Sequence, residues 1–388
     1  MKWLVKKAAV LGAGVMGAQI AAHLANARVP VVLFDLPAKE GDKNAVVKKA
    51  LDGLKRLQPS PLVSRDTLQY IDAANYEEHL ELLSGCDLII EAIAERMDWK
   101  NDLYARIAPF VTPGAVLASN TSGLSINGLA DALPAALRPN FCGIHFFNPP
   151  RYMPLVEIIA TRDSAPAMLD GLETWLTSRL GKGVVRALDT PNFVANRIGV
   201  FSILAVMHHT AAFGLGFDTA DALTGPKIGR SRSATFRTGD VVGLDTLAHV
   251  VNTMRDTLPD DPWHAFFKAP AWLDGLITRG VLGQKTKGGI YRKQGKTIEV
   301  FDPAVGDYRA SDYSISIEVA AILKLTDPAA RLKALRESAD AQAQFLWAIF
   351  RDLFHYCAVQ LEHVADNARD VDFALRWEIG RASCRERV

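Results

Sequence analysis

The chain has 388 residues, 49% hydrophobic and 22% charged, which predicts a folded protein large enough for two or more domains. With 44 basic and 43 acidic residues the formal charge is +1, so neither a nucleic acid nor an anionic membrane is indicated as a partner. The cysteines lack metal-ligand spacing, and no apolar run approaches the roughly 20 residues that span a bilayer. We therefore expect a cytoplasmic protein without a metal site, a disulfide framework or a membrane span.

The first predicted elements are a strand, a tight glycine turn, a helix and a second strand, between residues 8 and 35. Glycines in the pattern Gly-x-Gly-x-x-Gly allow a sharp turn, a close approach of backbone to a pyrophosphate, and close packing of helix on strand. The second strand ends in an aspartate, which would accept the ribose hydroxyls of NAD and repel the 2′-phosphate of NADP. The sequence thus predicts an NAD site formed by Gly12, Gly14, Val15, Met16, Gly17 and Asp35.

An insertion over residues 36–85 follows and includes the basic stretch VVKKALDGLKRL. Its cationic side chains could meet a phosphorylated substrate, although a charge run on a helix is more often a solvated face. These side chains are Lys48, Lys49, Lys55 and Arg56.

Two further apolar strands are predicted at residues 86–93 and 114–120, separated by a helical pattern over 97–111. This alternation predicts a parallel sheet, whose ligands bind beyond the carboxyl ends of its strands. Polar residues lie there, but ordinary turn chemistry would explain them equally well. The candidates are Glu91, Ala92, Glu95, Ser119, Asn120, Thr121 and Ser122.

The segment GIHFFNPPRYMPLVEII places His145 twelve residues before Glu157, at the end of a predicted buried strand. A histidine can take the proton of an alcohol near neutral pH, and a carboxylate on its second ring nitrogen would fix its tautomer. On spacing alone, a structural histidine in an apolar strand remains the alternative.

Beyond about residue 188 helical patterns dominate, so we predict a nucleotide-binding domain over 1–188 and a helical domain for substrate binding and dimerisation over 189–377. A cap at Asp189 or Thr190 is expected to start a long helix that ends near residues 214–216. Asn196 and Arg197 are polar in its first turns, either as cleft residues or as an ordinary polar pair near the cap. Further helices are predicted over residues 218–223, 244–258, 263–279 and 341–366.

The chain resembles the NAD-dependent L-3-hydroxyacyl-CoA dehydrogenases over nearly its whole length, in the blocks GAGVMG, EAIAE, SNTSGLSI, HFFNPPRYMPLVEI and DTPNFVANRIG. The resemblance implies an α/β Rossmann-like doubly wound sheet domain followed by an all-α domain. It also implies NAD-dependent oxidation of the 3-hydroxyl of (S)-3-hydroxyacyl-CoA in fatty acid beta-oxidation. The implied partners are the acyl-CoA thioester and either a second copy of the chain or a thiolase.

The resemblance also assigns roles to residues. His145 would be the general base, Glu157 would orient it, and Ser122 and Asn196 would hydrogen-bond the substrate. Lys55 is a candidate contact to coenzyme A. The family's nicotinamide and ribose contacts fall on Glu91, Glu95, Lys100, Asn120 and Ser122.

The segment TGPKIGRSRSATFRTGDVVGLDT looks like the version in long bacterial proteins, where an enoyl-CoA hydratase unit follows the dehydrogenase unit. Residues 378–388, EIGRASCRERV, look like translated adapter sequence, so we expect an incomplete helical domain. Two other functions remain open. One is a different NAD-dependent β-hydroxyacid dehydrogenase, which would use a lysine of the helical domain, and the other is a catalytically impaired NAD-binding fragment.

Overall fold

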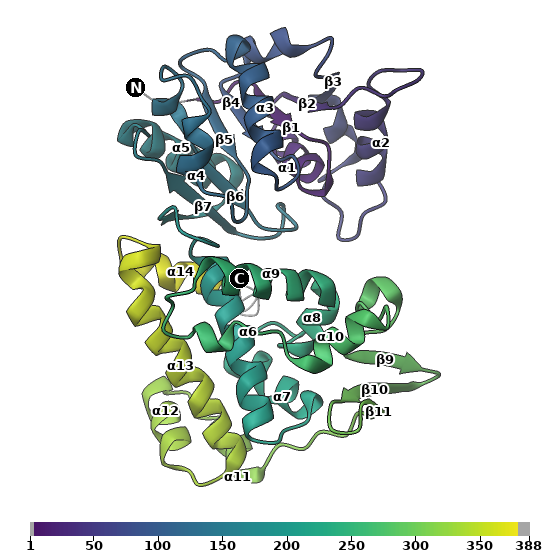
Figure 1. The fold of residues 1–388 in the computed structure, drawn as a ribbon, viewed down its shortest axis with the longest axis vertical. Coiled ribbons are helices and arrows are strands. Elements are labelled where there is room, and N and C mark those ends of the chain that lie inside the picture. Colours follow the sequence, from purple (N-terminus) through teal and green to yellow (C-terminus); the bar gives the residue numbers. More distant parts are fainter. Residues whose placement is uncertain (1–3, 379–388) are drawn as a thin grey trace. The chain divides into compact units, whose positions relative to one another are not determined.

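The computed structural model describes residues 4–378 and divides the chain into two compact units (Figure 1). The first unit extends to Val194 and also includes Leu361–Glu378, and the second runs from Ala195 to Gln360. The predicted tail over 378–388 lies outside the described residues, apart from Glu378 at the end of the last helix.

One sheet of eight strands forms the centre of the first unit, within the described residues, in the order β3-β2-β1-β4-β5-β6-β7-β8. The pairs from β3 through β6 are parallel, and β1 lies between β2 and β4, where the strand order reverses. This confirms the doubly wound α/β fold. The strands are β1 (Ala8–Leu11), β2 (Val31–Asp35), β3 (Ile71–Asn75), β4 (Leu88–Glu91), β5 (Val116–Ser119), β6 (Phe141–Phe146), β7 (Leu155–Ala160) and β8 (Gly183–Ala187).

The β6–β7 pair is antiparallel, unlike the rest of the predicted parallel sheet. Residues 147–154 connect the two strands, and this segment is too short for the crossover of a dozen or more residues that a parallel pair needs. β8 then pairs parallel to β7.

Helices pack against this sheet. Small residues let α1 approach the strands closely, and all of its residues from Gly17 to Ala25 are buried. The helices of this unit are α1 (Val15–Asn26), α2 (Ala45–Leu54), α3 (Met97–Ile107), α4 (Ile126–Asp131), α5 (Pro166–Leu180) and α14 (Ala368–Glu378).

The last described helix, α14, belongs to the sheet unit and packs against β8. Gly183 makes room for it, because a Cβ there would lie 2.5 Å from the ring of Trp377. The N–H of Leu188 also donates to the carbonyl of Val364 at 2.9 Å. These contacts place Leu361–Glu378 with the sheet, whereas the sequence assigned this stretch to the helical domain.

The second unit is mainly helical, as the sequence predicts. Its helices are α6 (Ala195–Ala212), α7 (Phe217–Thr224), α8 (Phe236–Val242), α9 (Leu244–Thr257), α10 (Ala271–Thr278), α11 (Ile317–Ile322), α12 (Pro328–Glu337) and α13 (Ala341–Val364), whose final turn joins the first unit. The helix predicted over 263–279 is shorter in the structure, where α10 begins only after Pro270. A proline disfavours helical backbone in the residue before it.

A small antiparallel sheet, which the all-α expectation did not include, also lies in the second unit. Short turns join its strands, the first of them over residues 295–296. The strands are β9 (Tyr291–Gln294), β10 (Thr297–Asp302) and β11 (Asp307–Ala310). No helix within residues 4–378 is both long enough and apolar enough to cross a membrane.

The predicted cap of α6 at Asp189 or Thr190 is wrong, since the helix begins at Ala195. Asn192 and Phe193 have φ angles of 63° and 51°, which interrupt helical backbone. Asp189 instead accepts hydrogen bonds from the backbone N–H groups of Ile126 and Asn127 at the start of α4, both at 2.8 Å.

At Gly17, helix α1 lies very close to the glycine turn, because a Cβ added there would lie 1.8 Å from the carbonyl oxygen of Gly12. We predict that Gly17→Ala lowers the free energy of unfolding by about 3 kcal/mol or more. Gly53→Ala in α2, where nothing lies within 4 Å of the added Cβ, is the matched control. It should raise stability by about 0.5–1 kcal/mol. Urea denaturation measures both, and equal effects would contradict the packing argument.

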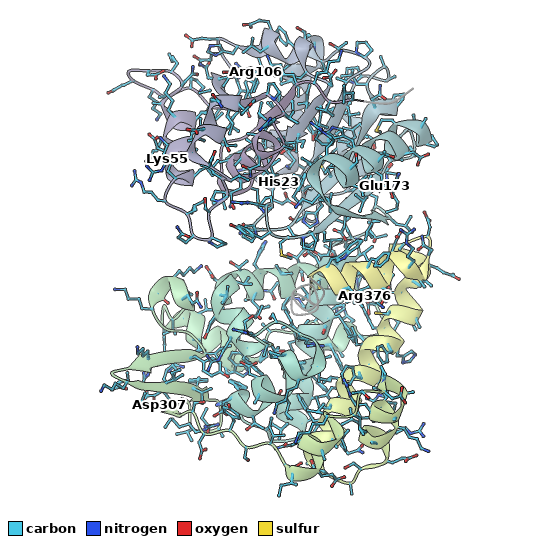
Figure 2. The ribbon with its side chains drawn as sticks, turned by 180° about the vertical axis from the view of Figure 1, so that it is seen from behind. His23, Lys55, Arg106, Glu173, Asp307 and Arg376 are labelled. Carbon is cyan, nitrogen blue, oxygen red and sulfur yellow. The ribbon has the colours of Figure 1, made fainter. Side chains whose placement is uncertain are left out.

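His23 on α1 predicts a pH dependence of stability. It lies within the first unit (Figure 2), and burial, together with the charges of Lys182 and Arg151, lowers its pKa from 6.5 to about 3. As the pH falls, His23 binds a proton near pH 6.5 in the unfolded chain but only near pH 3 in the folded chain. The free energy of unfolding therefore decreases as the pH drops through this window. Between pH 7 and pH 5.5 the loss from His23 is about 1.2 kcal/mol.

We expect His23→Leu to remove this part of the slope, measured as the urea midpoint against pH. His249→Leu, at an exposed position, should keep the wild-type slope. Parallel curves for the wild type and His23→Leu would rule out His23 as the source.

Candidate active site

His145 and Glu157 form a buried hydrogen-bonded pair. The antiparallel register sets them directly opposite each other on β6 and β7, and His145 Nδ1 lies 2.7 Å from Glu157 Oε2. Their residues are 3% and 0% exposed. The second carboxylate oxygen of Glu157 accepts the N–H of Val194 at 3.1 Å. The carboxylate is therefore held on both sides, and His145 Nε2 is left for another partner.

That partner is Ser122, whose hydroxyl lies 3.1 Å from His145 Nε2. Because the carboxylate accepts from Nδ1, neutral His145 accepts the Ser122 proton at Nε2. Ser122 itself is exposed, in the turn after β5, and the rings of Phe147 and Phe193 lie 4.4 and 5.8 Å from the imidazole. The line from Glu157 through His145 to Ser122 can thus exchange a proton at Nε2 with a group at the surface.

Two predicted site residues hold the Ser122 turn in place. The Glu95 carboxylate accepts the N–H groups of Ser122 and Gly123 at 2.8 and 3.0 Å, and the Thr121 hydroxyl also donates to it. The side-chain oxygen of Asn120 accepts the N–H of Phe146 at 2.9 Å, which ties the end of β5 to β6. In this structure Glu95 and Asn120 act on the turn and the strand end beside His145.

Glu91 and Lys100 form a second buried pair, at the end of β4. The ammonium of Lys100 lies 2.5 Å from Glu91 Oε1, and the two side chains are 1% and 0% exposed. The other oxygen of Glu91 accepts the hydroxyls of Tyr104 at 3.1 Å and Ser119 at 2.7 Å. The resemblance assigns this pair to the cofactor, but here the two side chains are enclosed and bond each other. Their cofactor role stays a prediction.

The residues of the predicted NAD site have the geometry that a dinucleotide needs. Gly12 has a φ angle of +104°, a backbone conformation that favours glycine. At Gly14, no atom lies within 4 Å of the position that a Cβ would occupy. α1 begins just after Gly14 without a side-chain cap or an acidic residue in its first turn, which contains Val15 and Met16. Its first N–H groups are therefore available to a pyrophosphate, and the residues present fit the cofactor.

Asp35 ends β2 beside this turn. Its carboxylate accepts the N–H of Ala13 and the N–H of Leu36, each at 2.6 Å. Ala92 lies on the other side, where its carbonyl oxygen would be 2.8 Å from a Cβ on Gly12. The ends of β2 and β4 therefore border the glycine turn, as the strand order requires.

Two predicted substrate contacts lie on other elements. Lys55 directly follows α2, is exposed, and bonds Asp52 at 2.7 Å; Figure 2 shows it at the margin of the first unit. Asn196 lies in the first turn of α6, in the second unit. Both roles stay predictions.

Lys182 is a positioning residue that sequence reasoning missed. Its buried ammonium donates to the carbonyls of Pro150 and Met153, the latter at 2.7 Å, in the loop that joins β6 to β7. Burial lowers its pKa from 10.5 to about 8. Only the pattern Gly-Lys-Gly before an apolar run marks it in the sequence, and that pattern carries no chemistry. Within residues 4–378, no cluster of three or more His, Cys, Asp or Glu could hold a metal ion.

Comparisons with known proteins match two family models. Residues 7–190 match the 3-hydroxyacyl-CoA dehydrogenase NAD binding domain, and residues 193–293 match the 3-hydroxyacyl-CoA dehydrogenase C-terminal domain. A protein of Deinococcus radiodurans named probable 3-hydroxyacyl-CoA dehydrogenase is 40% identical over 74% of this chain and 83% of its own length. One of the same name from Bacillus subtilis is 38% identical over 97% of this chain and 49% of its own length.

Among solved structures, FadB2 of M. tuberculosis is 30% identical, with a TM-score of 0.62 over 75% of this chain and 99% of that one. The chain spans about half the length or less of several curated relatives that it matches. For the fatty acid oxidation complex subunit alpha of Pseudomonas putida, 34% identical over 78% of this chain, the share is 42%.

The buried Glu91–Lys100 pair predicts a large loss of stability when one partner is removed. Lys100→Met leaves a buried carboxylate without its cation and should lower the free energy of unfolding by about 3–5 kcal/mol. The double variant Glu91→Gln/Lys100→Met removes both charges and should recover most of that loss.

The control is Lys48→Met, which breaks the exposed pair with Asp42 and should barely move the urea midpoint. If the double variant were as unstable as Lys100→Met, the unpaired charge would not be the cause.

Proposed function

The chain belongs to the 3-hydroxyacyl-CoA dehydrogenase family, and we propose that it oxidises the 3-hydroxyl of an (S)-3-hydroxyacyl-CoA thioester to the ketone with NAD. The observation that carries this proposal is the bonded line Glu157–His145–Ser122 in the unit that carries the dinucleotide turn. The names of the curated relatives support the same substrate class, and the reaction would belong to fatty acid beta-oxidation.

His145 is the general base in this proposal. A substrate hydroxyl that binds between Ser122 and Nε2 would give its proton to that nitrogen. Glu157, at 2.7 Å from Nδ1, keeps the ring in the tautomer with a free Nε2 and stabilises the imidazolium that forms. Bound NAD supplies the acceptor for the hydride that leaves C3.

Ser122 and the aromatic residues prepare this site for the substrate. The hydroxyl of Ser122, fixed through the bonds of its turn to Glu95, would donate to the substrate oxygen and hold it at hydrogen-bond distance from His145. Phe147 and Phe193 are 8% and 0% exposed and limit the access of water to the ring. Asn196 is proposed as a second donor to the substrate and Lys55 as a contact to coenzyme A.

Asp35 supports NAD over NADP. Its carboxylate stands at the end of β2, beside the glycine turn, where it would accept the ribose hydroxyls and repel a 2′-phosphate. The proposed partners are a second copy of the chain or a thiolase, and the proposed compartment is the cytoplasm. A relative named as a subunit of the fatty acid oxidation complex supports membership of such a complex.

The two other functions make different predictions. A β-hydroxyacid dehydrogenase of the lysine-dependent type would oxidise free hydroxy acids in preference to hydroxyacyl thioesters. A cofactor-binding fragment without activity would bind NAD but form no NADH. The Glu157–His145 pair favours the thioester dehydrogenase because it supplies a base without a lysine of the helical domain.

We predict that His145→Gln lowers turnover about 100-fold to 10,000-fold, since a general base contributes roughly this factor. NAD affinity should not change, because the glutamine leaves the turn over residues 12–17 intact. NADH absorbance after addition of 3-hydroxybutyryl-CoA measures turnover, and calorimetry measures NAD binding.

His249→Gln, at an exposed position of the second unit, is the matched control and should keep wild-type turnover. Unchanged turnover in His145→Gln would refute His145 as the base. Tight NAD binding by the wild type without any NADH formation would instead support the inactive fragment.

A further inference from the structure

The second unit contains a pocket of about 330 Å³ that the proposed reaction does not use. Residues of α7, α8 and β9, and of the loops after α7 and β11, line it. Its volume lies at the lower end of the roughly 300–1,000 Å³ usual for small-molecule sites. The residues that carry charge or an aromatic ring indicate what such a ligand would be.

Three cationic side chains line this pocket: Lys227, Arg232 and Arg237. All three are exposed, and none has an acidic partner within the described part of the chain. The guanidinium of Arg237 lies 4.4 Å above the ring of Tyr291, which limits its positions. Three cations around one cavity make the electrostatic potential there locally positive, in a chain whose net charge is only +1.

The acids of the pocket are already bonded elsewhere. Asp218 accepts both ends of the Arg309 guanidinium, at 2.8 and 2.9 Å, so its charge is paired. Asp221 is buried, and its carboxylate accepts three backbone N–H groups at the start of α8 and the Tyr291 hydroxyl at 2.9 Å. The cations are therefore in excess over the carboxylates that could neutralise them.

One aromatic ring in the pocket is accessible. Tyr313 lines the cavity and is 58% exposed, whereas Arg237 covers the ring of Tyr291. An open aromatic face beside several cations suits a ligand that has both a planar base and phosphate groups, because bases stack on aromatic rings and phosphates accept from Lys and Arg.

We propose that this pocket binds a nucleotide through its phosphates on Lys227 and Arg232 and its base on Tyr313, with adenine nucleotides as the probes. The site is separate from the dinucleotide turn after β1, and binding of a free nucleotide there does not depend on the proposed dehydrogenase activity. Two sources share this chemistry: a free nucleotide such as ADP, and the nucleotide end of coenzyme A, represented by adenosine 3′,5′-bisphosphate.

Calorimetric titration of the full chain with ADP and with adenosine 3′,5′-bisphosphate tests the proposal. We expect the double variant Lys227→Gln/Arg232→Gln to weaken one binding event at least about tenfold, because charge-assisted hydrogen bonds to phosphate are lost. The same event should weaken as salt rises. Asp35→Ala should affect only the event at the dinucleotide turn, which separates the two sites.

Two controls test specificity. The pair Lys293→Gln/Lys296→Gln removes the same charge from exposed positions outside the pocket and should leave binding unchanged. Tyr313→Leu should weaken ADP binding roughly fivefold or more but not the binding of inorganic pyrophosphate, which has no base to stack. Tighter binding of ADP or of the bisphosphate identifies the source.

The proposal fails if no binding event responds to Lys227→Gln/Arg232→Gln, or if the control pair weakens binding as much. It also fails if Tyr313→Leu changes pyrophosphate and ADP binding equally. Circular dichroism of each variant shows whether the fold is intact, and the five side chains substituted in the second unit are all exposed, so folding should persist in those variants.

Discussion

The antiparallel register of β6 against β7 is the constraint on which the site depends. It sets His145 opposite Glu157, and cross-strand neighbours in such a pair lie close enough for their side chains to bond. A slip of one residue would turn one of the two side chains to the other face of the sheet. The buried ammonium of Lys182 donates to two carbonyl oxygens of the loop that joins β6 to β7. The strand pairing and this buried cation therefore both hold the register.

The other parts of the site come from strand ends that the doubly wound topology places side by side. β1, β4, β5 and β6 are neighbours in the sheet, so the glycine turn, the Glu95 segment, the Ser122 turn and His145 lie along one edge. Buried polar contacts hold this edge: the Glu91–Lys100 pair at β4, and the Asn120 amide between β5 and β6. Such groups are costly to bury unless bonded, and here each is bonded.

In the interior of the second unit, buried polar side chains are likewise hydrogen-bonded to one another. The guanidinium of Arg197, in the first turn of α6, donates to Asp261 at 3.1 Å and to Gln360 at 2.8 Å. Tyr356 donates to the same aspartate at 3.0 Å. Arg197 thus ties α6 to α13 and to the loop before α10. The sequence left open whether this arginine was a cleft residue or an ordinary polar residue near the cap, and its bonds make it part of a buried network.

The sequence alone determined the features that depend on local chemistry. The spacing of Gly12, Gly14 and Gly17, the position of Asp35, and the alternation of apolar strands with helices predicted a parallel sheet with an NAD site, and the family resemblance implied that the sheet is doubly wound. The three-stranded sheet, the true start of α6 and the place of α14 on β8 were not predictable, because they depend on backbone angles and packing. The pairing of His145 with Glu157 had motif support but no local cause. Only the tertiary structure, by folding residues 147–154 back into an antiparallel pair, decided that the two side chains bond, and it alone enclosed Lys100 and Lys182, since burial arises from contacts distant in sequence.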